Sequence, residues 1–367
     1  MKRCWSANAA DRPTMVQVIA YLRMVIDHLN TEEAKNQVTG KADSKNVQSF
    51  EAMDLTLAKP SIPLISLDQV NSLVLETSSH PLSGLRVAMG ILGGTRVSVQ
   101  IFDKSNEEAQ HNFANQMEIF KAMRCPALPT ALAYSLLPQN AIICESLQGE
   151  SVRNFLQSPK EFSLDQAVQL LFECAKSMTV LHTWSPALLH RNVSSRVFKM
   201  QRRQGLLDSS GLDIEIGDLS FARFYSSVHP PVSNLGAWEE PEYCAPECFN
   251  PSGLYSEKSD VFSFAIVIWE VTVRCLFGKY VRPYLDVEDK SDVSFMNEIV
   301  RNNKRPAVSA DCQVILFPNL LHAKPISGCP AQLLELMETS WSPNALARPC
   351  FADLANNLSQ YLSTLRS

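Results

Sequence analysis

Hydrophobic residues recur at two different periods along the chain, and each period predicts a different element. Around residue 100, Val97, Val99 and Ile101 alternate with polar residues, which is the pattern of a half-buried β-strand. Apolar residues spaced three or four apart predict amphipathic helices at residues 15–29, 167–182 and 351–365. The longest apolar run, residues 261–269, is too short to cross a membrane. We therefore expect strands and helices in one chain without a transmembrane span.

The composition narrows the class of protein. The chain has 367 residues, of which 46% are apolar, enough for one large domain or two ordinary ones. A net charge of −5 gives no sign of nucleic-acid binding. Ten cysteines occur without C-x-x-C spacing or paired histidines, which favours reduced thiols over a metal site or a disulfide framework. Because Asp11, Arg12 and Pro13 interrupt any signal-peptide core, we expect a cytoplasmic protein.

Five short motifs, in a fixed order, resemble those of protein kinases. Residues 189–198, L-H-R-N-V-S-S-R-V-F, resemble the catalytic loop H-R-D-L-x-x-x-N. D-L-S at 218–220 is similar to D-F-G, A-P-E at 245–247 is intact, and S-D-V-F-S-F at 259–264 resembles the start of the central helix of the large lobe. Residues 341–349 resemble the C-W-x-x-x-P-x-x-R-P signature of tyrosine and tyrosine-kinase-like kinases. The resemblance covers about residues 63–365.

This resemblance implies an α+β fold of two lobes. A small β-rich lobe is expected at residues 61–145, a hinge at 145–149 and a larger, mainly helical lobe at 150–367. In the family, certain residues hold or brace the catalytic loop, pair with a phosphorylated activation segment, or join the A-P-E segment to a late helix. The residues that match them here are His190, Arg191, Glu247, Asp260 and Arg348. We therefore expect the scaffold of the fold to be intact.

At the positions of the family's catalytic, metal-binding and phosphate-binding residues, this chain has other side chains. Asn192 stands where the family has the Asp that accepts the substrate proton, and Val197 stands where it has a magnesium-binding Asn. An amide takes no proton near neutral pH, and valine offers a metal no oxygen. Gln100 matches the phosphate-binding lysine, and Gln116 matches the helix Glu that pairs with it, with Glu118 as the rival if the alignment slips by two. Two glutamines could hydrogen-bond to each other and hold the helix without charge.

The nucleotide cleft is correspondingly degenerate. The three glycine positions of the phosphate loop fall on His80, Leu82 and Leu85, so backbone groups lose the close approach that glycine permits. The hinge resemblance places Cys144, Glu145 and Leu147 against an adenine, which backbone groups bind in the family. Asp218 is the one retained metal-ligand type, and its alternative role is a solvated or capping carboxylate. We therefore expect that the domain requires neither ATP nor magnesium. The sequence leaves open whether it binds them.

Two regions lie outside the matched motifs. M-x-x-x-W and a later Arg-Pro recur at residues 1–13 and 337–349, each before an amphipathic helix, so we interpret residues 1–30 as the end of a preceding kinase domain and 31–60 as a polar linker. A chance match is the alternative. The stretch 307–328 reads as an apolar insertion that either docks a partner or packs on the lobe.

The residues that stabilise the fold are kept and those that carry the chemistry are replaced, which together favour a pseudokinase. We expect an allosteric or scaffolding partner of another kinase domain or signalling protein. One alternative is a divergent but active Ser/Thr or Tyr kinase, in which other charged groups replace the lost ones; another is a chain with no selected function. The activation segment, residues 218–247, carries several hydroxyls and is either a phosphorylation switch or an ordinary exposed loop.

Overall fold

A computed structural model describes residues 62–75, 85–146, 149–202, 212–225, 240–249, 255–285, 287, 291–306 and 329–367. The predictions for residues 1–30, 31–60 and 307–328 lie outside the described residues, as do those for Leu147 and for the glycine positions His80 and Leu82. Leu85 is described, and its side chain is buried.

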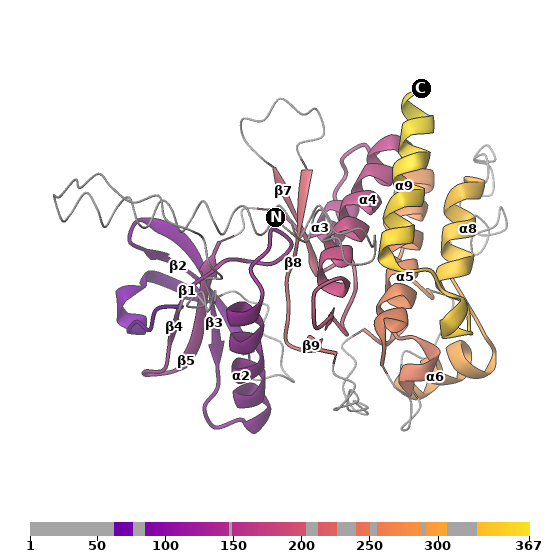
Figure 1. The fold of residues 1–367 in the computed structure, drawn as a ribbon. Helices are drawn as coiled ribbons and strands as arrows, with labels where there is room; N and C mark the ends of the chain where they lie inside the picture. Colours follow the sequence, from indigo (N-terminus) through magenta and orange to yellow (C-terminus); the bar gives the residue numbers. More distant parts are fainter. Residues whose placement is uncertain are drawn as a thin grey trace, which may run out of the picture. The chain divides into compact units, whose positions relative to one another are not determined.

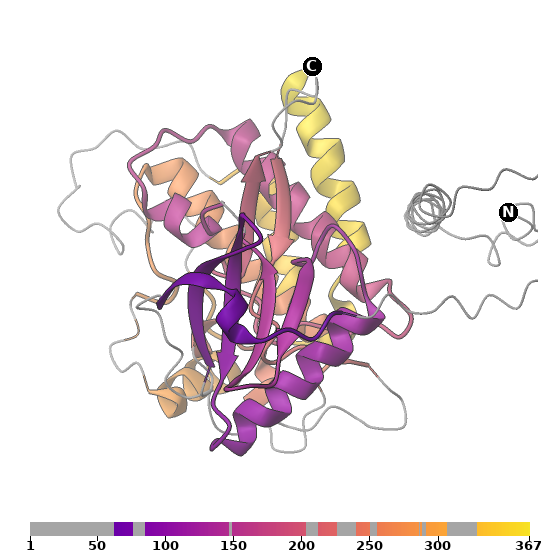
Figure 2. The same cartoon turned by 90° about the vertical axis from the view of Figure 1, so that its left-hand side faces the viewer.

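The small lobe is a five-stranded antiparallel sheet with one long helix packed against it (Figures 1 and 2). The strand order is β1-β2-β3-β5-β4. The elements are the short 3-10 helix η3 (Leu67–Gln69), β1 (Asn71–Leu75), β2 (Leu85–Leu92), β3 (Thr95–Phe102), helix α2 (Glu107–Ala122), β4 (Ala131–Ser135) and β5 (Asn140–Glu145). Gly93 and Gly94 turn β2 into β3 with φ of 57° and 86°, a region that favours glycine. The alternation predicted for β3 is confirmed, because Val97 and Val99 are fully buried.

The large lobe is mainly helical (Figure 1). Its long helices are α4 (Leu164–His182), α5 (Glu257–Phe277), α8 (Ala331–Ser340) and α9 (Phe351–Arg366). Its shorter helices are α3 (Val152–Gln157), η4 (Pro241–Tyr243), η5 (Pro246–Phe249), α6 (Asp292–Met296), η6 (Asn297–Arg301) and η8 (Ala345–Ala347). Two small antiparallel ladders join β6 (Leu188–Leu189) to β9 (Arg223–Phe224) and β7 (Phe198–Arg202) to β8 (Leu212–Ile216).

The helix boundaries follow from capping residues. Ser256 accepts a hydrogen bond from the backbone of Lys258 at the start of α5, and Gly278 ends that helix with φ of 70°. Ser163 and Gln166 form a capping box at the start of α4. The predicted helix at 167–182 is therefore confirmed, although the capping box starts it earlier, at Leu164. The predicted helix at 351–365 is confirmed as α9.

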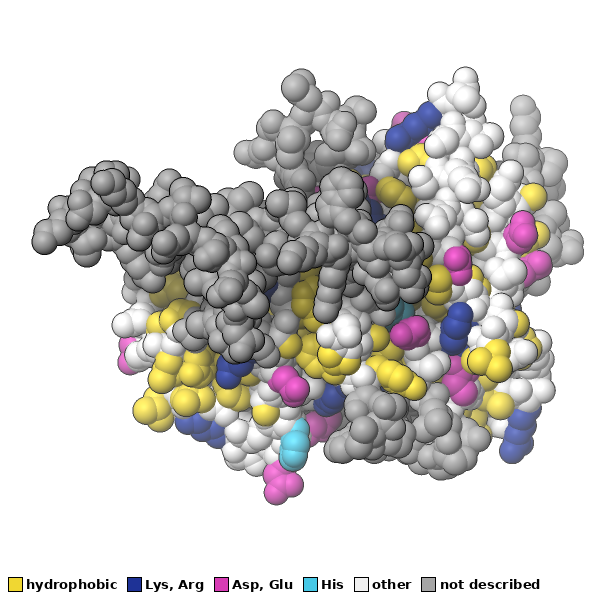
Figure 3. Space-filling view, in the orientation of Figure 1, with side chains coloured by type: hydrophobic (Ala, Val, Ile, Leu, Met, Phe, Trp, Pro, Cys, Tyr) yellow, Lys and Arg dark blue, Asp and Glu magenta, His cyan; other side chains and the backbone are white. Residues whose placement is uncertain are grey.

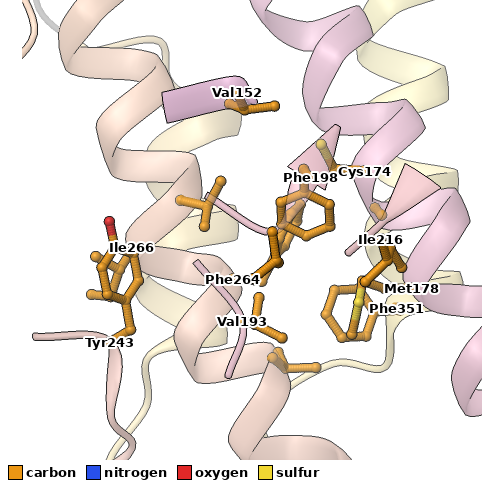
Figure 4. Packing of buried hydrophobic residues seen from close by; sticks show 14 of the residues in the cluster. Val152, Cys174, Met178, Val193, Phe198, Ile216, Tyr243, Phe264, Ile266 and Phe351 are labelled. Atoms are coloured by element: carbon orange, nitrogen blue, oxygen red, sulfur yellow. The ribbon is translucent and has the colours of Figure 1, made fainter. Parts of the chain in front are cut away.

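The loop between β6 and β7, called the central loop below, is held in place by aromatic packing beneath it. In Figure 4, Phe198, Phe264 and Phe351 meet at the centre of the core, near Val193. The ring centroids of Phe198 and Phe264 are 5.9 Å apart, and those of Phe264 and Phe351 are 5.2 Å apart, both edge to face. Because Val193 and Phe198 bracket the residues between them, the core holds both ends of this loop in place.

The described surface mixes charges of both signs. On the face shown in Figure 3, acidic and basic side chains are interspersed, and apolar side chains gather at the lower left, over the sheet of the small lobe. No described helix combines the length and apolar character that a bilayer crossing needs.

Candidate functional site

The loop between β6 and β7 is braced by one buried carboxylate. Asp260, fully buried on α5, accepts hydrogen bonds from the backbone N–H groups of His190 and Arg191, each at 2.9 Å. Burial alone would raise the pKa of Asp260, but hydrogen bonds from His182 at 2.8 Å and Tyr255 at 2.7 Å outweigh it and hold that pKa below its usual range. The bracing lets Arg191 keep a φ of 66°, a strained value for a side chain of its size.

His190 ties this loop to the end of β8. Its Nε2 donates to the carbonyl of Gly217 at 3.0 Å, while its Nδ1 accepts from the backbone N–H of Asn192 at 3.3 Å. These two bonds require a neutral ring with its proton on Nε2. The consequence is that Asn192 and Asp218 are brought together from segments that are distant in sequence.

The amide of Asn192 is bonded to the carboxylate of Asp218. The Asn192 Nδ2 donates to the Asp218 Oδ2 at 3.0 Å, an orientation that follows because a carboxylate only accepts. Val197, which matches the second metal ligand, is buried instead, and its carbonyl accepts from the backbone N–H of Gly217 at 2.8 Å. No cluster of three or more His, Cys, Asp or Glu side chains able to hold a metal occurs among the described residues. The Asp218 carboxylate is the group here that could hold a magnesium ion, together with waters and phosphate oxygens.

Two glutamines replace charge in the small lobe without bonding to each other. Gln116 is 1% exposed and neither of its amide atoms has a hydrogen-bond partner; the Gln100 Oε1 is likewise buried and unpartnered. The hydrogen bond considered between them is therefore not formed. Glu118 points to solvent, so the structure places Gln116, and not its rival, on the inner face of α2.

Helix α2 is instead attached to the segment after Asp218. The Asn115 Nδ2 donates to the carbonyl of Ala222 at 2.8 Å. One turn earlier, the Asn112 Oδ1 lies 3.5 Å from an Arg223 nitrogen. Burial and the nearby Arg191 lower the pKa of Arg223 to about 10. These amide contacts link α2 to the large lobe. The ion pair that the family has at positions 100 and 116 is replaced by two neutral glutamines.

A carboxyl group that the motifs did not single out, Glu215, lies near Glu145 at the end of β5. Burial, with help from Glu145 and Asp213, raises the pKa of Glu215 to about 7, and burial raises that of the Cys144 thiol to about 12. Glu145 itself ends β5 and is exposed. Glu215 lies on β8, opposite Lys199 of β7 and three positions before the D-L-S segment. Its position next to that segment is the sequence feature that could have drawn attention to it.

A bidentate ion pair fixes the A-P-E segment. The Arg348 guanidinium donates to both carboxylate oxygens of Glu247, at 2.7 and 2.9 Å, and also to the carbonyls of Lys258 and Ser342. It stacks over the Phe262 ring, 5.0 Å from the centroid. Burial opposes ionisation of Glu247, yet Arg348 lowers its pKa below the usual range. This pair joins η5 to the segment that precedes α9.

Comparison with known proteins assigns the family. Residues 86–358 match the family model described as protein tyrosine and serine/threonine kinase, which is most of the chain. The chain belongs to the protein kinase family. The α+β two-lobed fold expected from the motifs is therefore confirmed.

Several proteins named as kinases, each much longer than this chain, are similar to it. This kinase domain is 24% identical over 278 residues to the stress-activated protein kinase alpha of Dictyostelium discoideum, covering 74% of this chain and 39% of that protein. It is 27% identical over 290 residues to the probable serine/threonine-protein kinase roco7 of the same organism, covering 76% of this chain and 10% of that protein. A third relative, another probable serine/threonine-protein kinase of that organism, is 33% identical over 187 residues, 48% of this chain and 17% of its own length. The chain thus spans well under half of each of these relatives.

Proposed function

We propose that this kinase domain is a pseudokinase, which transfers little or no phosphate and serves as an allosteric or scaffolding partner in phosphorylation signalling. The observation that carries the proposal is the bond from Asn192 to Asp218. The side-chain amide of Asn192, at the position of the base, donates a hydrogen bond. Its acceptor is the Asp218 carboxylate, which stands at the position of a metal ligand. Loss of a general base alone typically costs about 10²–10⁴ in rate.

Neighbouring substitutions support the same function. Val197 supplies no metal ligand, and Gln100 supplies no cation at the phosphate position. Losses of this kind are each commonly worth about 10²–10³ in rate, although they do not simply add. The buried scaffold bonds of Asp260 and Arg348, in contrast, are complete, as expected of a domain kept for its shape.

Thermal unfolding of the chain with ATP, with and without magnesium, tests the proposal. A ligand at about 100 times its dissociation constant adds roughly 2.7 kcal/mol, a shift of a few degrees for a domain of this size. The expected result is no magnesium-dependent shift. A magnesium-dependent shift that Asp218→Ala abolishes would show that Asp218 still holds a metal, and phosphoryl transfer by the wild type under the same conditions would then overturn the proposal.

A second candidate function is a divergent but active Ser/Thr or Tyr kinase. The retention of Asp218, with φ of 50°, favours it, because that strained backbone holds the one metal-ligand type that remains. Phosphoryl transfer to a generic protein substrate, lost in Asp218→Ala and retained in Glu338→Gln on the exposed face of α8, would establish it.

We further infer that the domain belongs to the tyrosine-kinase-like group and had a tandem kinase neighbour. The signature at residues 341–349 supports the group, and its partial repeat at residues 1–13 supports the neighbour. The partner would then be that second kinase domain or another cytoplasmic signalling protein. Co-purification of a catalytically competent kinase whose activity changes on adding this chain tests the partnership.

A further inference from the structure

Helix α9 lies on a surface of the large lobe that is formed chiefly by α4. Figure 1 shows the two helices side by side, and they pack against each other along their length. At the start of α9, the Phe351 ring lies edge to face with His182 at 5.0 Å and with Phe264 at 5.2 Å between centroids. At its end, the Arg366 Nη2 donates to the Gln169 Oε1 at 3.0 Å. We call this surface, from His182 and Phe264 to Gln169, the α9 seat.

The side chains that α9 buries on its seat recur at helical spacing. They are Phe351, Leu354, Leu358, Tyr361 and Leu362. The side chains between them on the other face, such as Ser359 and Gln360, are exposed. A helix that replaced α9 would therefore need apolar residues at these five positions and could be polar at the exposed ones.

The N-terminal part of the chain repeats this pattern position by position. Pairing Arg12-Pro13 with Arg348-Pro349 aligns the two segments without a gap. Every buried position of α9 then has an apolar counterpart. The counterparts, in order, are Met15, Val18, Leu22, Val25 and Ile26. Residues 14–29 lie outside the described residues, and it is their sequence that matches the burial pattern of α9.

The signals that begin the helix also match. In α9 the backbone N–H of Cys350 donates to the Asp353 carboxylate at 3.1 Å, as part of a capping box. The aligned residues are Thr14 and Gln17, which are the residue types that form such a box. The second segment therefore has both the apolar face and the start signal that the seat requires.

The match is closer in position than in size. Met15 and Val25 align with the larger rings of Phe351 and Tyr361, and a smaller buried side chain removes less apolar surface from water. The segment has larger side chains only at positions where α9 is half-buried or exposed. Helix α9 is therefore the stronger occupant of its seat, and the second segment is the weaker one.

We propose that the α9 seat is an interaction surface for a second copy of this chain, whose residues 14–29 take the place of α9. Exchange of matching elements between copies is a low-cost route to a dimer, because each seat stays filled. The Arg348 pair with Glu247 stays intact, because the exchanged segment begins after Pro349. Once one segment has exchanged, the reciprocal exchange occurs within the pair and is favoured by proximity. This inference does not depend on whether the domain transfers phosphate.

Weakening α9 in the full chain tests the exchange. Leu358→Ala removes a buried contact from the middle of α9 and is expected to strengthen dimerisation, measured by sedimentation velocity, at least about tenfold. Adding Leu22→Asp is expected to abolish the dimer. Met24→Asp, which aligns with the exposed Gln360, is the matched control and is expected to leave the dimer intact. A Leu358→Ala chain that stays monomeric at every concentration, or a dimer that survives Leu22→Asp, would overturn the proposal.

A labelled peptide of residues 12–30 probes the seat without requiring a dimer. It is expected to bind the Leu358→Ala chain at least about tenfold tighter than the wild type, whose own α9 fills the seat. The peptide with Leu22→Asp is expected to lose this binding, and the peptide with Met24→Asp to keep it. If Leu358→Ala does not fold, Leu362→Ala, nearer the end of α9, provides the same comparison. Equal affinity for the wild type and the weakened chain would place the peptide elsewhere and overturn the proposal.

Discussion

The side-chain amide of Asn192 donates a hydrogen bond to the carboxylate of Asp218 at 3.0 Å. The two residues come from the central loop and from the end of β8, and His190 and Asp260 hold those segments together. The amide at position 192 supplies one hydrogen-bond donor to the Asp218 carboxylate. The same contact makes the site sensitive to a second negative charge.

Replacing Asn192 by Asp is expected to destabilise the domain rather than create an enzyme. Two carboxylates would lie about 3 Å apart with no matching cation, so one of them must bind a proton or separate. We expect a loss of about 1–3 kcal/mol in unfolding free energy at neutral pH, measured by urea denaturation, and a smaller loss at pH 4. Asn192→Ala, which removes only the hydrogen bond, is the control. An Asn192→Asp variant as stable as the wild type at neutral pH would show that the two carboxylates do not repel each other as expected.

Replacing Gln116 by Leu is expected to stabilise the domain. The side chain is buried and both of its amide atoms lack partners, so an apolar side chain of similar size removes a desolvation cost. We expect a gain of about 1 kcal/mol in unfolding free energy. Glu118→Gln, on the exposed face of the same helix, is the control and should change stability by less than about 0.5 kcal/mol. A loss of stability in Gln116→Leu would show that the amide makes a contact that matters.

Replacing Glu215 by Gln is expected to flatten the pH dependence of stability. The folded pKa of Glu215 is raised to about 7 from 4.5, so the folded state binds its proton more tightly than the unfolded state. Stability from this group is therefore greatest below pH 4.5 and falls as the pH rises toward 7. Because the side chain is partly exposed, we expect Glu215→Gln to recover only about 1 kcal/mol at pH 8.

Thermal unfolding from pH 4 to pH 8 measures this difference between wild type and Glu215→Gln. Glu118→Gln is again a suitable control, since its carboxyl is exposed. Parallel curves for wild type and Glu215→Gln would mean that the folded pKa is close to the unfolded one.

Removing Arg348 is expected to be more damaging than removing the whole ion pair. Arg348→Ala leaves the partly buried Glu247 without its cation and empties a fully buried site, which should cost about 3–5 kcal/mol. The double variant Arg348→Met and Glu247→Gln replaces both charges and should cost less. Urea denaturation of the two variants and of Arg348→Lys, which keeps the charge without the bidentate geometry, makes the comparison. A double variant at least as unstable as Arg348→Ala would show that packing, not the unpaired charge, dominates.

The spacing of hydrophobic residues predicted these strands and helices well, because it depends only on neighbouring residues. The alternation at β3 and the helical spacing in α4 and α9 are properties of neighbouring residues, and the structure has each of them. The start of α4 was placed three residues too late, because the Ser163 and Gln166 capping box was not considered. The kinase motifs placed Asn192, Asp218 and Asp260 in the correct order along the chain, and the family match supports the fold that they implied.

The sequence by itself determined the family, the fold and the substitution of charged groups by Asn192, Val197, Gln100 and Gln116. Only the tertiary structure decided that the two glutamines do not bond to each other, that the pKa of Glu215 is raised, and that Arg153 pairs with both Glu240 and Glu270. The physical reason is that the identity of a side chain is local, whereas its burial and its partners depend on residues far away in sequence. Hydrogen bonding and pKa follow from those partners, so no spacing rule along the chain contains them.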